Sequence, residues 1–372
     1  MNQEAFYTAI IIGAATILPI LVIGYLLPSF SRKSLIFGVS IPEEVSSSDE
    51  VKKLKGLYFK YLSIANLVSL VASYGLWELL EMELVNISMF ATILLVLALS
   101  VSYYLVHIKG KQLKAEKGWK VGKKQIIVVN TIRKESTTNF NFSWFWLPAT
   151  MVIVTFIVIA IAYPTLPEQI PGKYDFEGNV TRYDEKSALT LSILPLTMLG
   201  MTVMFYFISK MIVKAKENIN PKYPEISAKK NRIAKYRWVV CMLILACFMN
   251  LLFMVTQFHS FGWLGIKNIT PLVLILTFGP IIPIIYVAFI TGQSGSRVKI
   301  KEDIEIEGVM HSDDDDQWLM GMIYYNRNDP SLWVEKRFGV GWTVNAGHSI
   351  GIGIYVLTIF LLVGMLIIPF ML

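Results

Sequence analysis

The chain has 372 residues, of which 54% are hydrophobic and only 16% are charged, and its formal net charge is +7. Soluble domains are about one quarter charged, so this composition excludes a chain that covers a water-exposed globular surface. Several uncharged runs reach the roughly 20 residues needed to cross the hydrocarbon core of a bilayer. The sequence therefore predicts an all-α polytopic integral membrane protein.

Eight transmembrane helices are predicted, at residues 6–27, 61–78, 86–106, 144–163, 187–209, 238–258, 270–291 and 350–371. Gly279 and Pro280 predict a kink in the seventh, because proline removes a backbone hydrogen bond. The expected domains are a three-helix region (1–143), a two-helix unit (144–240) with a proline-rich loop (164–186), two further helices (241–291), a β-rich element (292–349) and a last helix (350–372).

Lysine and arginine alternate between the predicted loops. Of the 34 such residues, 30 lie in the odd-numbered loops and only four in the even-numbered ones. The positive-inside rule then places the odd loops in the cytoplasm and both termini outside, in a multi-pass plasma-membrane protein. The basic face is expected to contact the anionic inner leaflet of the bilayer rather than to bind nucleic acid directly.

Residues that do chemistry are sparse in the predicted spans. No ionisable residue lies near the middle of any span, and the chain has no H-E-x-x-H, Walker A or G-x-S-x-G sequence. We therefore predict no catalytic residue, no cofactor and no metal, and expect a protein that is not an enzyme. For Asn66 and Asn250, an interhelical hydrogen bond is favoured over a transport site. The acidic run Asp313–Asp316 is read as solvated rather than as a cation site.

The first loop carries a helical pattern of its own. Ser48 or Asp49 is a plausible N-cap, and residues 49–60 read as an amphipathic helix lying at the inner interface. Its apolar face would hold Val51, Leu54, Leu57 and Tyr58. The tripeptide Phe-Gly-Val of residues 37–39 recurs at 338–340, on the side of the membrane expected for both loops.

The fourth loop is rigid, aromatic and acidic. Three prolines within eight residues hold the chain extended, and Tyr174 and Phe176 alternate with charged residues, which suggests a strand or hairpin arm. A plain linker between two helices would need only a few polar residues. The candidate ligand-binding residues are Pro167, Glu168, Pro171, Lys173, Tyr174, Asp175, Glu177 and Gly178.

The same loop resembles a bacterial membrane domain of unknown function. The matching residues are Leu166, Pro167, Ile170, Pro171, Tyr174, Asp175 and Gly178, and the resemblance covers about residues 144–240. That domain occurs in SdpI-type proteins, the immunity and signalling proteins for the sporulation-delaying peptide toxin. The familiar pattern commonly has histidine where this chain has Lys173. The resemblance implies a bacterial cell membrane and a role in immunity or signalling.

The seventh loop is predicted to be rich in β-structure. Val298, Ile300, Ile304 and Ile306 alternate with charges, as in a half-buried strand. The string Tyr-Tyr-Asn-x-x-Asp-Pro, followed by Lys-Arg-x-Gly-x-Gly-Trp-Thr-x-Asn, resembles a second short bacterial domain of unknown function, over roughly 318–348. That domain accompanies the first in some membrane proteins. The candidate residues for binding a cytoplasmic partner are Trp333, Lys336, Arg337 and Trp342.

Two functions of different class fit these features. The first is a sensor or immunity protein that recognises an extracellular peptide or envelope signal, the natural ligand of the acidic outer face being a cationic peptide. It would relay that signal to a cytoplasmic regulator. The second is a transporter or transporter subunit that exports a peptide or lipid through kinked helices, since broken helices form the substrate sites of many transporters.

Overall fold

The structure, a computed structural model, describes residues 16–80, 84–119, 140–174, 179–217, 219, 223–300, 314–339 and 341–367. The chain divides into two compact units. The first contains Met1–Ser136, Ala215–Ile233 and Ile290–Leu372, and the second contains Thr137–Lys214 and Ala234–Phe289. Each unit is therefore assembled from segments that are far apart in the sequence.

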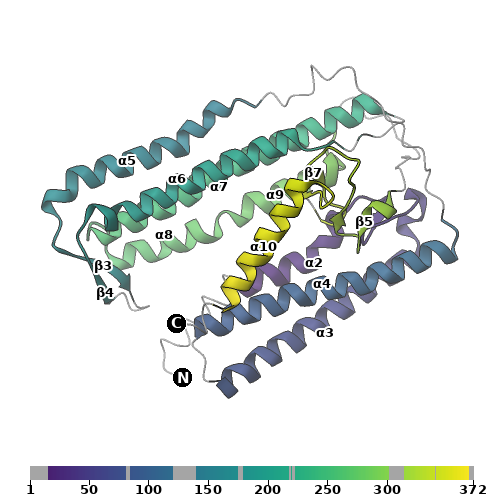
Figure 1. The fold of residues 1–372 in the computed structure, drawn as a ribbon, viewed down its shortest axis with the longest axis horizontal. Coiled ribbons are helices and arrows are strands. Elements are labelled where there is room, and N and C mark those ends of the chain that lie inside the picture. The colour runs from purple at the N-terminus through teal and green to yellow at the C-terminus, as the bar shows by residue number, and fades with distance from the viewer. Residues whose placement is uncertain are drawn as a thin grey trace. The chain divides into compact units, whose positions relative to one another are not determined.

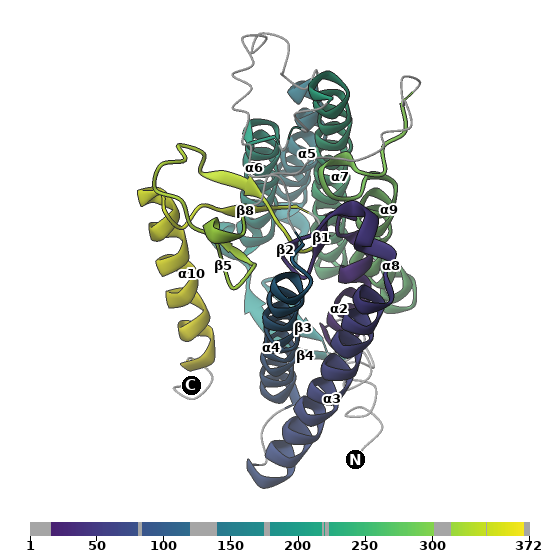
Figure 2. The ribbon, with the colours of Figure 1, turned by 90° about the vertical axis from the view of Figure 1, so that its right-hand side faces the viewer.

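In the first unit, a long helical pair carries a small hairpin. Helices α3 (Asp49–Leu80) and α4 (Leu84–Glu116) pack side by side, and α2 (Leu18–Phe30) contacts both (Figure 1). Between α2 and α3 lie strands β1 (Leu35–Ile36) and β2 (Val39–Ser40) and the short 3₁₀ helix η2 (Glu43–Ser47). Strand β2 lies at one end of α4 in Figure 2. The last helix, α10 (Ser349–Ile367), also belongs to this unit.

The segment predicted as a separate interfacial helix is instead the beginning of α3. The helix runs without a break from Asp49 to Leu80, so the prediction of a helix lying along the membrane surface is wrong. Its apolar face is nevertheless real, because Val51, Leu54 and Tyr58 are all buried. They pack against the β1–β2 hairpin and α4. Protein, and not lipid as the amphipathic pattern had suggested, therefore covers this apolar face. The Ser48 hydroxyl accepts a hydrogen bond from the Val51 backbone, as an N-cap does.

The second unit is a helical bundle with a long hairpin. Helix α5 (Trp146–Ala162) follows the 3₁₀ turn η3 (Phe142–Phe145) and leads through η4 (Tyr163–Thr165) to strands β3 (Gln169–Tyr174) and β4 (Val180–Glu185). Helix α6 (Ala188–Lys214) then packs against α5. Most of α7 (Pro224–Ser260), α8 (Ile266–Phe278) and most of α9 (Ile281–Thr291) complete the unit. The predicted kink is confirmed as a break between α8 and α9 at Gly279 and Pro280.

The helices confirm a helical polytopic membrane protein. Within the described residues, six helical segments are long and apolar enough to cross a bilayer, and Leu18–Phe30 and Ser349–Leu361 are shorter apolar helices. Large apolar side chains point away from the protein along these segments, for example Leu67 on α3 and Phe360 on α10, which are 63% and 73% exposed. Apolar surface of this extent requires a lipid environment.

Asn250 of α7 joins this helix to two neighbouring helices. The side-chain amide of Asn250 donates hydrogen bonds to the Pro148 carbonyl on α5 and to the Thr202 hydroxyl on α6, both at 2.9 Å. Interhelical bonds of this kind are worth about 1 kcal/mol in membranes. This is the interhelical role that the sequence favoured for Asn250. Asn66 is buried on α3 in the first unit.

The segment before the last helix forms two small antiparallel hairpins. Strands β5 (Trp318–Leu319) and β6 (Ile323–Tyr324) make one, and strands β7 (Trp333–Glu335) and β8 (Trp342–Val344) make the other. We call residues 314–348, without residue 340, the C-terminal β-element. It confirms the predicted β-rich insertion. The strand predicted from Val298 onward is not formed at Val298–Ile300, and residues 301–306 lie outside the described part of the chain.

Candidate functional site, a buried arginine junction

The turn between β6 and β7 is organised by one buried amide. The Asn345 side chain is fully buried, and its nitrogen donates to the carbonyls of Asn326 (2.9 Å), Asp329 (3.2 Å) and Ser331 (3.3 Å). Its oxygen accepts from the backbone nitrogens of Asn326 (3.1 Å) and Gly347 (2.9 Å). An amide supplies both donors and acceptors, which is why asparagine suits the last position of the Lys-Arg-x-Gly-x-Gly-Trp-Thr-x-Asn motif.

The aspartate of the same motif connects the C-terminal β-element to the segment that follows α6. One oxygen of Asp329 accepts from the Tyr324 hydroxyl (2.9 Å) and from the Lys216 ammonium (2.6 Å). The Lys216 backbone also donates to the Trp333 carbonyl at 3.1 Å. Burial raises the pKa of Asp329, but hydrogen bonds from Lys216 and Ser331 lower it by more, so the net pKa lies below its ordinary value.

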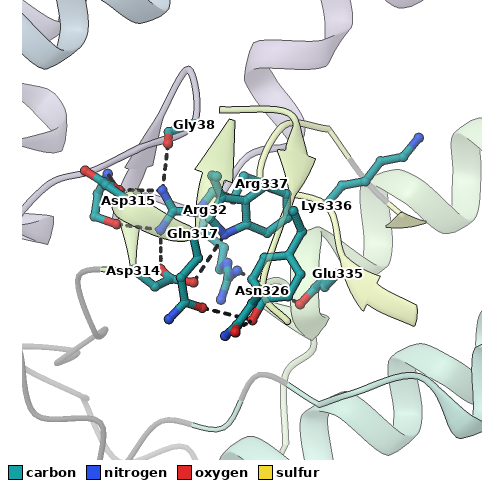
Figure 3. Close-up of polar contacts among 12 residues, drawn as sticks. Arg32, Gly38, Asp314, Asp315, Gln317, Asn326, Glu335, Lys336 and Arg337 are labelled. Carbon is teal, nitrogen blue, oxygen red and sulfur yellow. Dashed lines mark hydrogen bonds and ion pairs between the residues drawn. The ribbon is translucent and has the colours of Figure 1, made fainter. Parts of the chain in front are cut away.

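Arg337 lies at the centre of the junction that Figure 3 shows. Its side chain is only 4% exposed, and it lies two residues after the end of β7. One guanidinium nitrogen donates to the Gly38 carbonyl (2.7 Å) and to Asp315, and the other donates to the Ser40 hydroxyl (3.1 Å) and to Asp314. The rigid planar fork of arginine suits such a set of acceptors, which here come from two distant parts of the chain.

The Asp315 carboxylate has three hydrogen-bond partners. It accepts from the Ser40 backbone nitrogen (3.0 Å), from the Lys114 ammonium at the end of α4 (2.7 Å), and from Arg337. Burial raises its pKa, but Arg337 and Lys114 lower it by more, to about 2. Burial likewise lowers the pKa of Arg337, and the two aspartates outweigh this, so its pKa lies above the ordinary value. The cluster is therefore ionised at neutral pH.

The solvated reading of the acidic run is thus wrong for Asp314 and Asp315. Both carboxylates pair with Arg337, and the side chain of Asp315 is only 11% exposed. The cations that pair with these carboxylates are Arg337, between β7 and β8, and Lys114 on α4. Both lie outside the acidic run, so the sequence of the run alone does not predict the ion pairs. Asp313 lies outside the described residues. Across the residues that the structure describes, no three His, Cys, Asp or Glu side chains are grouped to hold a metal ion.

Aromatic rings surround the charged centre. The Phe338 ring lies 4.3 Å from that of Tyr103 and 5.8 Å from that of Phe37, measured between centroids. The first residues of the two Phe-Gly-Val tripeptides are therefore neighbours. Gly38 has a φ of +76°, and a Cβ there would collide with the Tyr103 hydroxyl. Only glycine lets the Gly38 carbonyl approach Arg337 in this way.

A second contact lies beside the first. Arg32, just after α2, forms an ion pair with Glu335 of β7 at 4.0 Å. The Gln293 side chain accepts from the Arg32 backbone at 3.1 Å and donates to the Lys336 carbonyl. The C-terminal β-element is thus bonded to the chain after α2, to the end of α4 and to the turn after α9.

The predicted partner-binding residues have different environments. Arg337 is buried and bonded within the molecule, Trp333 and Trp342 are half-buried on β7 and β8, and the Lys336 side chain is exposed. The β7–β8 register pairs Glu335 with Trp342. Binding of a cytoplasmic partner by these four residues stays a prediction.

The proline-rich loop forms the predicted hairpin. Strands β3 and β4 pair antiparallel from Gln169–Glu185 to Tyr174–Val180. Of the predicted ligand-binding residues, Pro167, Glu168 and Lys173 are exposed and Pro171 is half-buried. Tyr174 is half-buried against the His259 ring, at 4.4 Å between centroids. Asp175, Glu177 and Gly178 lie outside the described residues, and ligand binding by the hairpin stays a prediction.

Comparison with known families places two short matches on these features. Residues 150–199 match a domain of unknown function (DUF1648), and residues 327–352 match a family of unknown function (DUF5808). The first match covers most of α5, the β3–β4 hairpin and the beginning of α6, and the second includes Asp329, Arg337 and Asn345. No curated protein and no solved structure matches the chain. Two domains of unknown function are therefore present where the sequence suggested them, and the resemblance to SdpI-type proteins stays a prediction.

We predict that replacing Arg337 detaches the C-terminal β-element. In Arg337→Met, Asp314 would lose its cation and the buried Asp315 would keep only Lys114; breaking a buried pair costs about 3–5 kcal/mol. Hydrogen exchange of residues 314–348 at neutral pH should become at least tenfold faster. Arg327→Lys, at an exposed arginine of the same element, is the control and should exchange like the wild type. Unchanged protection in Arg337→Met would contradict the junction.

Acid should open the junction in a defined range. Because the pKa of Asp315 falls from 3.8 to about 2 on folding, its ionised form stabilises the junction above about pH 4, and this stabilisation is lost between pH 4 and pH 2. Pepsin cleavage within residues 314–348 should therefore accelerate across that range in the wild type. The Asp315→Asn variant at each pH corrects for the protease. It should be cleaved readily throughout, and parallel curves for the two proteins would show that Asp315 is not the responsible group.

Proposed function

We propose that this protein is a sensor or immunity protein of a bacterial plasma membrane. It recognises an extracellular peptide or envelope signal through the β3–β4 hairpin and relays that signal to a cytoplasmic regulator through the C-terminal β-element. The resemblance of the hairpin region to SdpI-type proteins supports this proposal. The distribution of lysine and arginine supports the orientation, with the hairpin outside.

One connection along the chain carries the proposal. Strand β4 ends at Glu185, α6 begins at Ala188 and ends at Lys214, and Lys216 binds Asp329 of the C-terminal β-element. A helix of 27 residues is about 40 Å long, enough to cross the hydrocarbon core. In this proposal, a displacement of the hairpin reaches Lys216, one of the residues that bind the C-terminal β-element, along α6.

The exposed side chains of the hairpin suit a peptide with both charge and apolar surface. Tyr183 is 55% exposed on β4, beside the exposed Arg182, and Glu168 and Glu185 are exposed at its base. The even-numbered loops carry more acidic than basic residues over their whole length. That imbalance favours a cationic amphipathic peptide, attracted by charge and held by apolar contacts.

The relay is tested by removing its last contact. Lys216→Gln deletes the charge that pairs with Asp329 and leaves the hairpin unchanged. Cells that carry it in place of the wild type should lose the response to a panel of cationic peptide toxins, read as survival and as transcription. The control is Lys214→Gln, an exposed lysine in the last turn of α6, which should respond normally. The same sensitivity and transcription in deletion and wild-type cells would contradict the proposal.

Orientation has its own test. A single cysteine at Thr181 on β4 should react with an impermeant reagent added outside intact cells, because the hairpin is expected there. A single cysteine at Lys229 on α7 should react only after the cells are opened. The two native cysteines, Cys241 and Cys247, are first replaced by alanine. Labelling of both positions from one side would remove the hairpin from the outer surface and the proposal with it.

Export of a peptide or lipid is the second candidate, and the break between α8 and α9 is the observation that favours it. Interrupted helices expose backbone groups that bind cargo in transporters. Flux of a cationic peptide or a lipid through reconstituted protein, abolished by Pro280→Ala, would decide for export.

A further inference from the structure

The first unit contains a cavity of about 520 Å³ that the proposed relay does not use. Its walls come from the last turn of α2, the β1–β2 hairpin, η2, the beginning of α3, the first turns of α7, the turn after α9 and Phe338. Ligand-binding cavities in proteins usually measure 300–1,000 Å³, so this one is large enough for a small molecule or a lipid headgroup.

The walls of the cavity carry a strong excess of positive charge. Five basic residues line it, namely Arg32, Lys33, Lys55, Lys230 and Arg297, against the single acidic residue Glu43. Arg32 already pairs with Glu335, whereas Lys33 and Lys55 form no ion pair with any residue that the structure describes. Grouping like charges around one cavity is costly unless an anion neutralises them.

Hydroxyl groups that lack a partner lie among these cations. Ser34 is only 3% exposed, lines the cavity, and its hydroxyl has no hydrogen-bond partner in the described structure. The hydroxyl of Ser31, another lining residue, is in the same state. A buried hydroxyl without a partner is destabilising, so each of these hydroxyls can donate a hydrogen bond to a bound acceptor. The first turn of α7 adds Ile226 and Ser227, near a helix N-terminus that favours negative charge.

Apolar side chains form another part of the lining. Phe37, Ile41, Val51 and Phe338 contribute carbon surface to the same cavity. Pro28 and Ser29 also line it, in the last turn of the apolar helix α2, just before the first basic loop that the sequence predicts to lie at the inner face. The cavity therefore combines basic side chains with an apolar wall next to an apolar helix.

We infer that this cavity binds a phosphate group, whose oxygens accept from the Ser34 hydroxyl and pair with Lys55 and the other lining cations. Phosphate is the anion that best uses several ammonium, guanidinium and hydroxyl donors at once. The apolar wall and the end of α2 favour a phosphate carried by a membrane lipid. The basic face of the protein then has one defined lipid site in addition to its general attraction for the inner leaflet.

The test uses the full chain, purified in neutral detergent and analysed by native mass spectrometry. The probes are phosphatidic acid, a diacylglycerol with the same acyl chains, and glycerol 3-phosphate. Phosphatidic acid should bind at least tenfold more tightly than diacylglycerol. Binding of phosphatidic acid alone assigns the site to a lipid headgroup, whereas equally tight binding of glycerol 3-phosphate assigns it to a soluble phosphate ester.

Two variants locate the site. Lys55→Gln should weaken binding of the phosphate probe about tenfold, while Lys53→Gln, an exposed lysine two residues away that does not line the cavity, should leave it unchanged. Ser34→Ala should weaken binding severalfold without lowering the melting temperature of the free protein, because the hydroxyl has no partner to lose. Equal binding of phosphatidic acid and diacylglycerol, or wild-type affinity in both Lys55→Gln and Ser34→Ala, would overturn the inference.

Discussion

The burial of the Arg337 guanidinium is the constraint on which the first unit depends. A cation removed from water must be neutralised and must have its donors satisfied, or it costs several kcal/mol. Asp314 and Asp315 supply the charge, and Gly38 and Ser40 supply the remaining acceptors. Gly38 and Ser40 lie about 300 residues before Arg337 in the chain. The hydrogen bonds of this one side chain therefore hold the first loop and the C-terminal β-element together.

The two matched domains of unknown function have different physical characters. Two residues of the DUF5808 match, Asp329 and Asn345, are used to fold turns and to make contacts within the chain. The DUF1648 match places a rigid hairpin between two apolar helices and leaves polar and aromatic side chains exposed on it. One domain thus presents a surface, and the other anchors a small fold to the helices.

Several segments of the chain anchor the C-terminal β-element. The C-terminal β-element is bonded to segments that end or follow four helices, through Arg32 after α2, Lys114 on α4, Lys216 after α6 and Gln293 after α9. The position of this small element in the first unit therefore depends on contacts with several distant segments of the chain.

Composition and hydropathy by themselves determined the membrane class, the position of the helices, the α8–α9 break and the hairpin, because these depend on local runs, prolines and residue periodicity. The sequence also predicted the apolar face of residues 49–60. It could not predict that a protein hairpin rather than lipid contacts this face, because both environments favour the same amphipathic pattern. The tertiary structure alone decided the environment of Asp314, Asp315 and Arg337 and gathered the cavity around Ser34. Asp314, Asp315 and Arg337 find their further partners Gly38, Ser40 and Lys114 about 200–300 residues away, and contacts at such separations leave no periodic signal in the chain.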